Sequence, residues 1–179
     1  MIINKTRPTF CFWLTGLPCS GKTTIAKKLV EKLNALSNVK SINLDGDLLR
    51  ETLSSDLSFS EKDREEANRR ASQLAYILQL NKITSVVSMI SPTNHAREEA
   101  SKLFPEDTFK LIYLSTPLNV CKSRDVKGHY RKAENGQIAN FTGLSSEFEI
   151  PENYDLKIDT TSHKIDECVD LIMNSFDYY

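Results

Sequence analysis

The chain has 179 residues, 40% of them hydrophobic, which is enough to build the core of one globular domain. Its 23 lysines and arginines nearly balance 24 aspartates and glutamates, and this excludes the basic field of a general nucleic-acid-binding protein. No apolar run is long enough to cross a bilayer, and residues 1–8 lack the apolar core of a secretory signal. We therefore expect a cytoplasmic protein that binds a small molecule and neither nucleic acid nor membrane.

Apolar runs alternate with segments of helical period along the chain. This alternation predicts parallel strands joined by helical crossovers, and none of the runs shows the strict polar alternation of a half-solvated sheet. We predict a three-layer α/β fold with a five-stranded parallel sheet. The expected strands cover residues 10–14, 39–44, 83–90, 109–115 and 155–159, and the expected helices cover 21–36, a long segment from 60, 93–103, 117–124 and 164–176.

The stretch from about 125 to 150 is rich in charged residues and contains Gly128, Gly136 and Gly143. A connection of this length inside a compact domain is usually a lid or a disordered segment. We expect one domain over residues 1–179, with this stretch as its lid.

A phosphate-binding pattern, G-x-x-x-x-G-K-[ST], directly follows the first predicted strand. The backbone N–H groups of such a loop point into one concavity at the start of a helix, where they bind phosphate oxygens. We predict an ATP site in which Lys22 reaches the β- and γ-phosphates and the hydroxyl of Thr23 ligates Mg²⁺. The residues expected to form the loop are Gly16, Leu17, Pro18, Cys19, Ser20, Gly21, Lys22, Thr23 and Thr24.

Two carboxylates, Asp45 and Asp47, follow the second predicted strand. Parallel α/β sheets bind ligands at the carboxyl ends of their strands, so both side chains should face the phosphate loop. Phosphoryl transfer requires a positioned metal ion and an oriented acceptor hydroxyl. We expect Asp45 to hold Mg²⁺ through water and Asp47 to act on the acceptor hydroxyl as base or orienter. The alternative is that the Asp-Gly-Asp sequence is only a solvated turn.

Further motifs accompany these two sites. They are Leu44-Asp45-Gly46-Asp47 with Arg50, Asp-Leu-Ser-Phe-Ser at 56–60, Asp63-Arg64, Ile90-Ser91-Pro92, Thr116-Pro117-Leu118, Arg-Asp-Val-Lys-Gly at 124–128, Phe141-Thr142-Gly143 and Ile158-Asp159-Thr160. In order and spacing they resemble the adenylyl-sulfate kinases over nearly the whole chain. The resemblance implies a P-loop nucleotide-kinase-like fold and an enzyme of sulfate assimilation that phosphorylates the 3′-hydroxyl of adenylyl sulfate with ATP. It also implies a homodimer.

The resemblance assigns further site residues. Arg50 and Arg64 would hold the phosphosulfate of the acceptor, because forked guanidinium groups suit its anionic oxygens. Stacking on the acceptor adenine is implied for Phe59 and Phe141. Ser91 is the family's traditional phosphoserine, but we expect direct transfer in which Ser91 only hydrogen-bonds substrate. The other implied residues are Ile90 for the acceptor, Arg124 and Lys127 over the two nucleotides, and Thr160 for ATP. The alternatives are surface charges for the arginines and core positions for the aromatic residues.

Several positions depart from the family on the acceptor side. Ala67 stands where the family has an acceptor-binding Asn, and Asn68 points elsewhere because one residue turns a helix by about 100°. Met89, Thr93 and Asn94 also differ from the family's usual residues. These departures favour, as an alternative, a 3′-hydroxyl kinase for a related nucleotide such as cytidine diphosphoramidate. A third interpretation is a non-catalytic nucleotide-binding subunit. Such a subunit would not need the phosphate loop, both aspartates and the lid together, so their joint presence argues against it.

Overall fold

The structure is a computed structural model that describes residues 9–178. The stretch 1–8, on which the expected absence of a signal sequence partly depends, lies outside these residues, as does residue 179. Five parallel strands form a sheet in the order β2-β3-β1-β4-β5. The strands are β1 (Cys11–Thr15), β2 (Ser41–Asp45), β3 (Thr84–Ser88), β4 (Phe109–Leu114) and β5 (Leu156–Ile158).

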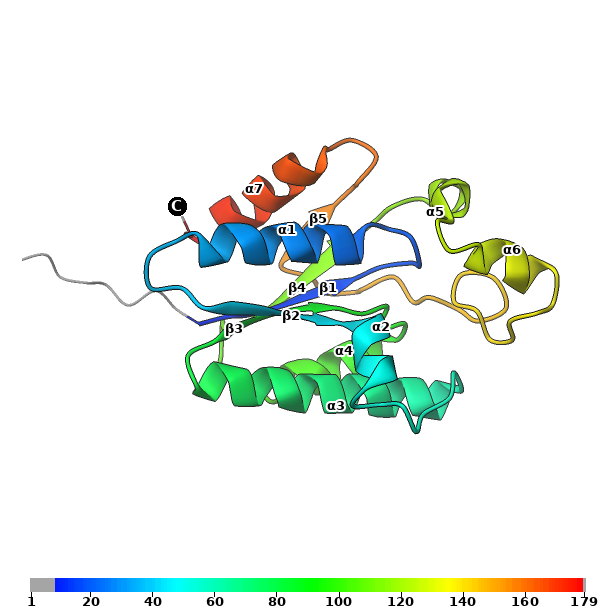
Figure 1. Cartoon of the computed structure of the whole chain (residues 1–179), viewed down its shortest axis with the longest axis horizontal. Coiled ribbons are helices and arrows are strands. Elements are labelled where there is room, and N and C mark those ends of the chain that lie inside the picture. Colours follow the sequence, from blue (N-terminus) through cyan, green and yellow to red (C-terminus); the bar gives the residue numbers. More distant parts are fainter. Residues whose placement is uncertain (1–8, 179) are drawn as a thin grey trace, which may run out of the picture.

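Helices cover both faces of this sheet (Figure 1). Helices α1 and α7 pack on one face, and α3 and α4 pack on the other. This arrangement confirms the predicted three-layer α/β fold. The helices are α1 (Lys22–Asn34), α2 (Gly46–Glu51), α3 (Glu61–Leu80), α4 (Asn94–Ser101), α5 (Leu118–Arg124), α6 (His129–Glu134) and α7 (Ile165–Ser175).

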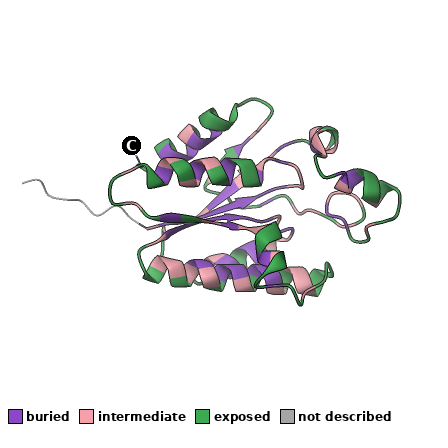
Figure 2. Cartoon of the chain, viewed as in Figure 1, coloured by how far each residue is buried: buried purple, intermediate pink, exposed green. Residues whose placement is uncertain are grey.

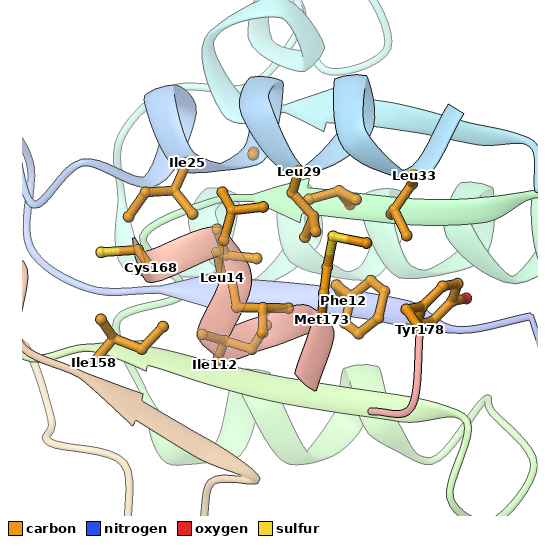
Figure 3. Packing of buried hydrophobic residues seen from close by; sticks show 14 of the residues in the cluster. Phe12, Leu14, Ile25, Leu29, Leu33, Ile112, Ile158, Cys168, Met173 and Tyr178 are labelled. Carbon is orange, nitrogen blue, oxygen red and sulfur yellow. The ribbon is translucent and has the colours of Figure 1, made fainter. Parts of the chain in front are cut away.

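Strand β1 lies at the centre of the sheet, and all five of its residues are buried. Successive side chains of a strand point to opposite faces. Phe12 and Leu14 therefore enter the apolar cluster under α1 and α7, whereas Cys11 and Trp13 enter the cluster beside α3. Figure 3 shows the first cluster at close range, and Figure 2 shows that burial is concentrated in the sheet and on the helix faces turned toward it. A sheet buried on both faces explains why its strands read as continuous apolar runs.

The predicted strands and helices are all present, with bounds shifted by a few residues. The sequence does not predict α2 and α6, because six residues are too few to show a helical period. Helix α6 lies within the predicted lid at 125–150, so part of that segment is regular rather than irregular. Together with α5, it lies beyond the carboxyl ends of the strands (Figure 1). No helix within residues 9–178 is long and apolar enough to cross a membrane.

Candidate active site

The phosphate loop joins β1 to α1, and glycine shapes both of its ends. Gly16 and Gly21 have φ angles of 150° and 101°. A Cβ atom on Gly16 would lie 2.7 Å from the carbonyl oxygen of Leu114, so no larger residue fits there. Among the described residues no side chain caps α1, whose N-cap is Gly21. The first backbone N–H groups of the helix are therefore available to phosphate oxygens.

Lys22 is buried in this loop, with 8% of its surface exposed. Its Nζ donates hydrogen bonds to the carbonyl oxygens of Gly16 at 2.8 Å and Leu17 at 2.7 Å, and to Oγ of Ser20 at 3.3 Å. Burial lowers the pKa of Lys22 to about 8, although Cys121, Cys19 and the carboxylates of Asp47 and Asp45 oppose the change. Within residues 9–178 no carboxylate pairs directly with Nζ. An ammonium group that meets only neutral oxygens fits the anionic phosphates of ATP.

Asp45 ends β2 and caps α2. Its Oδ1 accepts a hydrogen bond from the backbone N–H of Asp47 at 3.0 Å. Its Oδ2 accepts from the hydroxyls of Thr23 at 2.7 Å and Ser88 at 2.9 Å. Burial alone would raise the pKa of Asp45, but these hydrogen bonds together hold it below its usual value. Asp45 therefore faces the phosphate loop as a carboxylate, and with the Thr23 hydroxyl it offers the oxygen donors that Mg²⁺ prefers.

Asp47 lies in the first turn of α2, where its Oδ2 is ion-paired with Nζ of Lys127 in the lid. The hydrogen bond and the charge of Asp47 raise the pKa of Lys127. Both side chains are exposed, so solvent and ligands have access to the pair. The structure thus brings together a predicted acceptor carboxylate and a predicted lid residue.

The lid packs directly on the phosphate loop through a small apolar cluster of its own. Tyr130 and Phe141 meet edge to face with ring centroids 4.9 Å apart, and Leu17 and Cys19 of the loop pack against them. The hydroxyl of Tyr130 also donates to the carbonyl oxygen of Pro18 at 3.1 Å. The loop and the lid are therefore in contact in the free protein.

Arg124 and Thr160 lie on another side of the loop. Arg124 donates to the hydroxyl of Thr160 at 2.8 Å and to its carbonyl oxygen at 3.0 Å. The hydroxyls of Thr116 and Thr160 both reach the carbonyl oxygen of Ser20, at 3.2 Å each. This network connects the residues predicted to complete the ATP site to the phosphate loop. Thr24, the last predicted loop residue, is exposed in the first turn of α1.

Two arginines share one aromatic ring on the acceptor side. The guanidinium carbons of Arg50 and Arg64 lie 4.8 and 6.0 Å from the ring centroid of Phe59. Burial lowers the pKa of both arginines, and the charge of Arg50 lowers the pKa of Arg64 further. An anionic ligand would relieve this repulsion, so the pair fits the predicted binding of an acidic group.

The predicted aromatic pair is only indirectly connected. Phe59 is 59% exposed, whereas Phe141 is 9% exposed within the lid cluster. No ring contact joins the two among the described residues. Arg64 instead contacts the ring of Phe59 and donates to the residues on both sides of Phe141, the carbonyl oxygen of Asn140 and the hydroxyl of Thr142. The stacking role of the two rings stays a prediction.

Ile90 and Ser91 follow β3. The carbonyl oxygen of Ile90 accepts from the hydroxyl of Thr15 at 2.6 Å. Ser91 is 1% exposed and has a φ of 45°. Its Oγ is hydrogen-bonded to Nε1 of Trp13 at 2.8 Å and to Oδ1 of Asn68 at 2.6 Å. Ser91 therefore lies at the edge of the sheet predicted to bind ligand, with its hydroxyl held on both sides by protein atoms.

A cavity of about 250 Å³ lies between α3 and the start of α4. It is lined by Arg64, Asn68, Pro92, Thr93 and Ala96, together with Glu61, Glu65, Ser146, Glu147 and Glu149. Its wall includes Arg64, Pro92, which follows Ser91 in the sequence, and Asn68, which accepts a hydrogen bond from Ser91. The cavity therefore lies on the predicted acceptor side of the site.

The residues that depart from the family pattern occupy defined positions in the structure. Ala67 is 3% exposed and packs in the apolar cluster on the α3 face, as does Met89. Thr93 caps α4 by accepting from the backbone N–H of Ala96 at 3.2 Å. Asn94 accepts from Arg97 at 2.6 Å. As expected, Asn68 points away from the direction of Ala67, and it points toward Ser91.

Sequence reasoning missed Ser88, Tyr130 and Trp13. Ser88 lies opposite Asp45 in the pairing of β2 with β3, so a known strand order would reveal it. Tyr130 belongs to an unpredicted helix, and Trp13 reads as a core residue because it alternates with its strand neighbours. Their polar contacts depend on tertiary packing, which no local pattern shows.

Comparisons with known proteins agree with this geometry. The family model for adenylylsulphate kinase matches residues 8–159, which include both the phosphate loop and the lid. An adenylyl-sulfate kinase of Prochlorococcus marinus is 43% identical over 162 residues, covering 90% of this chain and 80% of that protein. A bifunctional CysN/CysC enzyme of Rhodopirellula baltica is 39% identical over 160 residues, 89% of this chain and 25% of its own length.

Among solved structures, that of the Mycobacterium tuberculosis APS kinase CysC in complex with AMPPNP and APS is similar, with a TM-score of 0.90. Its sequence is 36% identical, and the match covers 96% of this chain and 99% of that one. The chain spans only a quarter of the bifunctional relative but most of the monofunctional relative. The family model covers most of the described residues, the phosphate loop and lid included, and the chain therefore belongs to the adenylylsulphate kinase family.

Proposed function

We propose that the protein transfers the γ-phosphoryl group of ATP to the 3′-hydroxyl of adenylyl sulfate, giving 3′-phosphoadenylyl sulfate and ADP. The observation that carries this proposal is the meeting of Lys22, Asp45 and Asp47 at one edge of the sheet, beside the paired guanidinium groups of Arg50 and Arg64. One similar structure holds AMPPNP and APS, and several relatives are named adenylyl-sulfate kinase, which supports the choice of donor and acceptor.

On the donor side, Lys22 provides the positive charge for the phosphates. It exchanges its neutral backbone partners, the carbonyl oxygens of Gly16 and Leu17, for anionic phosphate oxygens. Thr23 and Asp45 are the residues that would hold Mg²⁺, Asp45 through water. Bound with ATP, Mg²⁺ supplies charge neutralisation on the phosphate oxygens.

On the acceptor side, Asp47 accepts the hydrogen of the 3′-hydroxyl. The acceptor oxygen then forms its bond to the γ-phosphorus while the bond from that phosphorus to the ADP oxygen breaks. Asp47 first exchanges its ion pair with Lys127 for the hydroxyl, which leaves Lys127 free to meet an anionic oxygen. Transfer is direct, because two substrates bound side by side need no phosphoserine at Ser91.

We propose one kinase domain over residues 1–179, in which the segment at about 125–150 covers the nucleotides and excludes water during transfer. The enzyme would be cytoplasmic and form a homodimer. Light scattering coupled to size-exclusion chromatography tests the oligomeric state, and a monomeric mass at micromolar concentration would reject the dimer.

A coupled assay of ADP release from ATP and Mg²⁺ tests the activity. Adenylyl sulfate and cytidine diphosphoramidate are offered separately at low micromolar concentration, with Lys22→Ala as the inactive control. We expect efficient turnover of adenylyl sulfate alone and none in the variant. Turnover of the cytidine compound alone would show that this nucleotide is the acceptor and that the enzyme acts in surface-polysaccharide modification. No acceptor-dependent ADP release with either compound would favour a non-catalytic subunit.

A further inference from the structure

A chain of buried hydrogen bonds runs from the central strand to α3. Nε1 of Trp13 donates to Oγ of Ser91 at 2.8 Å, and Oγ donates to Oδ1 of Asn68 at 2.6 Å. Nδ2 of Asn68 then donates to the carbonyl oxygen of Arg64 at 2.8 Å. Trp13, Ser91 and Asn68 are 0%, 1% and 3% exposed, so these bonds form away from water.

The groups at the two ends of this hydrogen-bonded network determine which atom donates in every one of its hydrogen bonds. An indole N–H can only donate, and a carbonyl oxygen can only accept. The Ser91 hydroxyl must therefore give its single hydrogen to Oδ1 of Asn68, and the amide of Asn68 must keep its nitrogen toward Arg64. Oγ of Ser91 therefore has no further hydrogen to donate and retains only acceptor capacity.

The backbone of Ser91 is held as firmly as its side chain. Its φ of 45° is a left-handed conformation that costs a serine energy. The buried guanidinium of Arg97 donates to its carbonyl oxygen at 2.6 Å. Asn68 therefore acts on a residue whose backbone is already held. Together with Nε1 of Trp13, it fixes the position of Oγ and the direction of the hydroxyl hydrogen.

Asn68 is also part of the wall of the acceptor cavity, one helical turn from Arg64. One amide hydrogen is bonded to the carbonyl oxygen of Arg64, and the other has no partner within residues 9–178. The same side chain therefore holds Ser91 and the α3 backbone that carries Arg64, and lines the space beside them.

We propose that Asn68 is a positioning residue that sets acceptor recognition: it makes Ser91 a pure hydrogen-bond acceptor and aligns Ser91 with the Arg64 turn. The acceptor nucleotide would present a hydroxyl or amino hydrogen to this wall and its anionic group to the arginines. This inference rests on the proposed function only in naming the acceptor.

The chain contains one tryptophan, so the indole N–H resonance of Trp13 reports on this network without any turnover. We would compare Asn68→Leu, which removes the amide at similar volume, with Ser72→Ala as the matched control. Ser72 is buried one turn further along α3 and donates to the carbonyl oxygen of Arg69, outside the network. We expect a clear shift and faster hydrogen exchange of the indole resonance in Asn68→Leu, and neither change in Ser72→Ala. An unchanged resonance in Asn68→Leu would overturn the positioning role.

Kinetics then tests specificity. We expect Asn68→Leu and Ser91→Ala each to raise the KM for adenylyl sulfate about five- to tenfold, as for the loss of a hydrogen bond, with the KM for ATP unchanged. Because Asn68 acts through Ser91, the double variant should be no worse than either single variant. Additive effects, or equal changes in both KM values, would overturn the proposal.

If Asn68→Leu does not fold, Asn68→Asp replaces it, because it keeps the oxygen that accepts from Ser91 and loses the donor to Arg64. The indole resonance should then stay near its original position while the KM for adenylyl sulfate rises, and a displaced resonance would count against the proposal. If the unaltered enzyme does not use adenylyl sulfate, the proposed function fails, and the resonance experiment still decides the role of Asn68.

Discussion

Lys127 in the lid is ion-paired with Asp47 at the start of α2, although 80 residues separate them in the sequence. Both belong to the acceptor side by prediction, and each neutralises the other in the free protein. Substrate must therefore replace a contact that already exists. The exposure of both side chains keeps that contact weak, since exposed ion pairs contribute about 0–1 kcal/mol.

Replacement of this lysine tests the proposed exchange. We expect Lys127→Ala to lower kcat/KM for the acceptor about tenfold, as for the loss of one charge-assisted hydrogen bond, with the free energy of unfolding changed by less than about 1 kcal/mol. Lys132→Ala, in α6 of the same lid, is the matched control and should change neither quantity. Steady-state kinetics and urea unfolding provide the measurements. Equal losses of activity in the two variants would mean that only the general charge of the lid matters.

The pH dependence of ATP binding follows from the lowered pKa of Lys22. Below about pH 8 the side chain is charged in the free protein, and above that value it loses its proton. Bound phosphates favour the charged form, so the dissociation constant for ATP should rise between about pH 8 and 9.5, by up to about tenfold per unit. Calorimetric titration from pH 7 to 9.5 measures it, with adenosine as the ligand that has no phosphate. A constant affinity for ATP across this range would contradict the assignment of Lys22.

The buried position of Ala67 predicts the effect of replacing it with asparagine. Ala67 packs among apolar side chains rather than lining the cavity, so Ala67→Asn should lower the free energy of unfolding by about 1–3 kcal/mol. ATP affinity should stay the same, and use of adenylyl sulfate should not improve. Ala75→Asn, on the same buried face of α3, gives the cost of burial alone. A lower KM for adenylyl sulfate in Ala67→Asn would show that the present alanine has shifted acceptor specificity.

The phosphate loop offers a test of shape. Gly16→Ala would bring a methyl group against the carbonyl oxygen of Leu114, which the sheet holds in place. Gly136→Ala, at a φ of 71°, meets open space and carries only the strain of a left-handed residue, about 1–2 kcal/mol. We expect Gly16→Ala to be less stable than Gly136→Ala by at least about 2 kcal/mol, measured by thermal unfolding. Equal melting temperatures would show that the loop relaxes around the methyl group.

Much of the fold follows from local patterns. Buried strands read as apolar runs, and the loop with Lys22 has a fixed pattern between a strand and a helix, so both are visible in the sequence. The neighbour of Asp45 in the sheet is less visible, because Ser88 reaches it only through the β2–β3 pairing. Helix α6 is too short for a period to show.

The limit of what the sequence predicts is clearest on the acceptor side. Comparison with the family pattern identifies Ala67 as a departure. It also predicts that Asn68 cannot take the place of the family's asparagine, since adjacent helix positions face different directions. That geometry is right, but the position of the Asn68 side chain depends on its contact with Ser91, which lies 23 residues further along the chain, just after β3. A polar contact between distant segments leaves no mark in the composition or period of either.

The apolar cluster formed by Leu17 and Cys19 with Tyr130 and Phe141 has a thermodynamic consequence. The phosphate loop and the segment proposed to cover the nucleotides are in direct packing contact, so a shift of one changes the packing of the other. If ATP strengthens acceptor binding through this contact by some factor, the acceptor must strengthen ATP binding by the same factor. The two substrates of this enzyme are therefore expected to bind cooperatively, and the apolar cluster between the loop and the lid is the contact that would couple them.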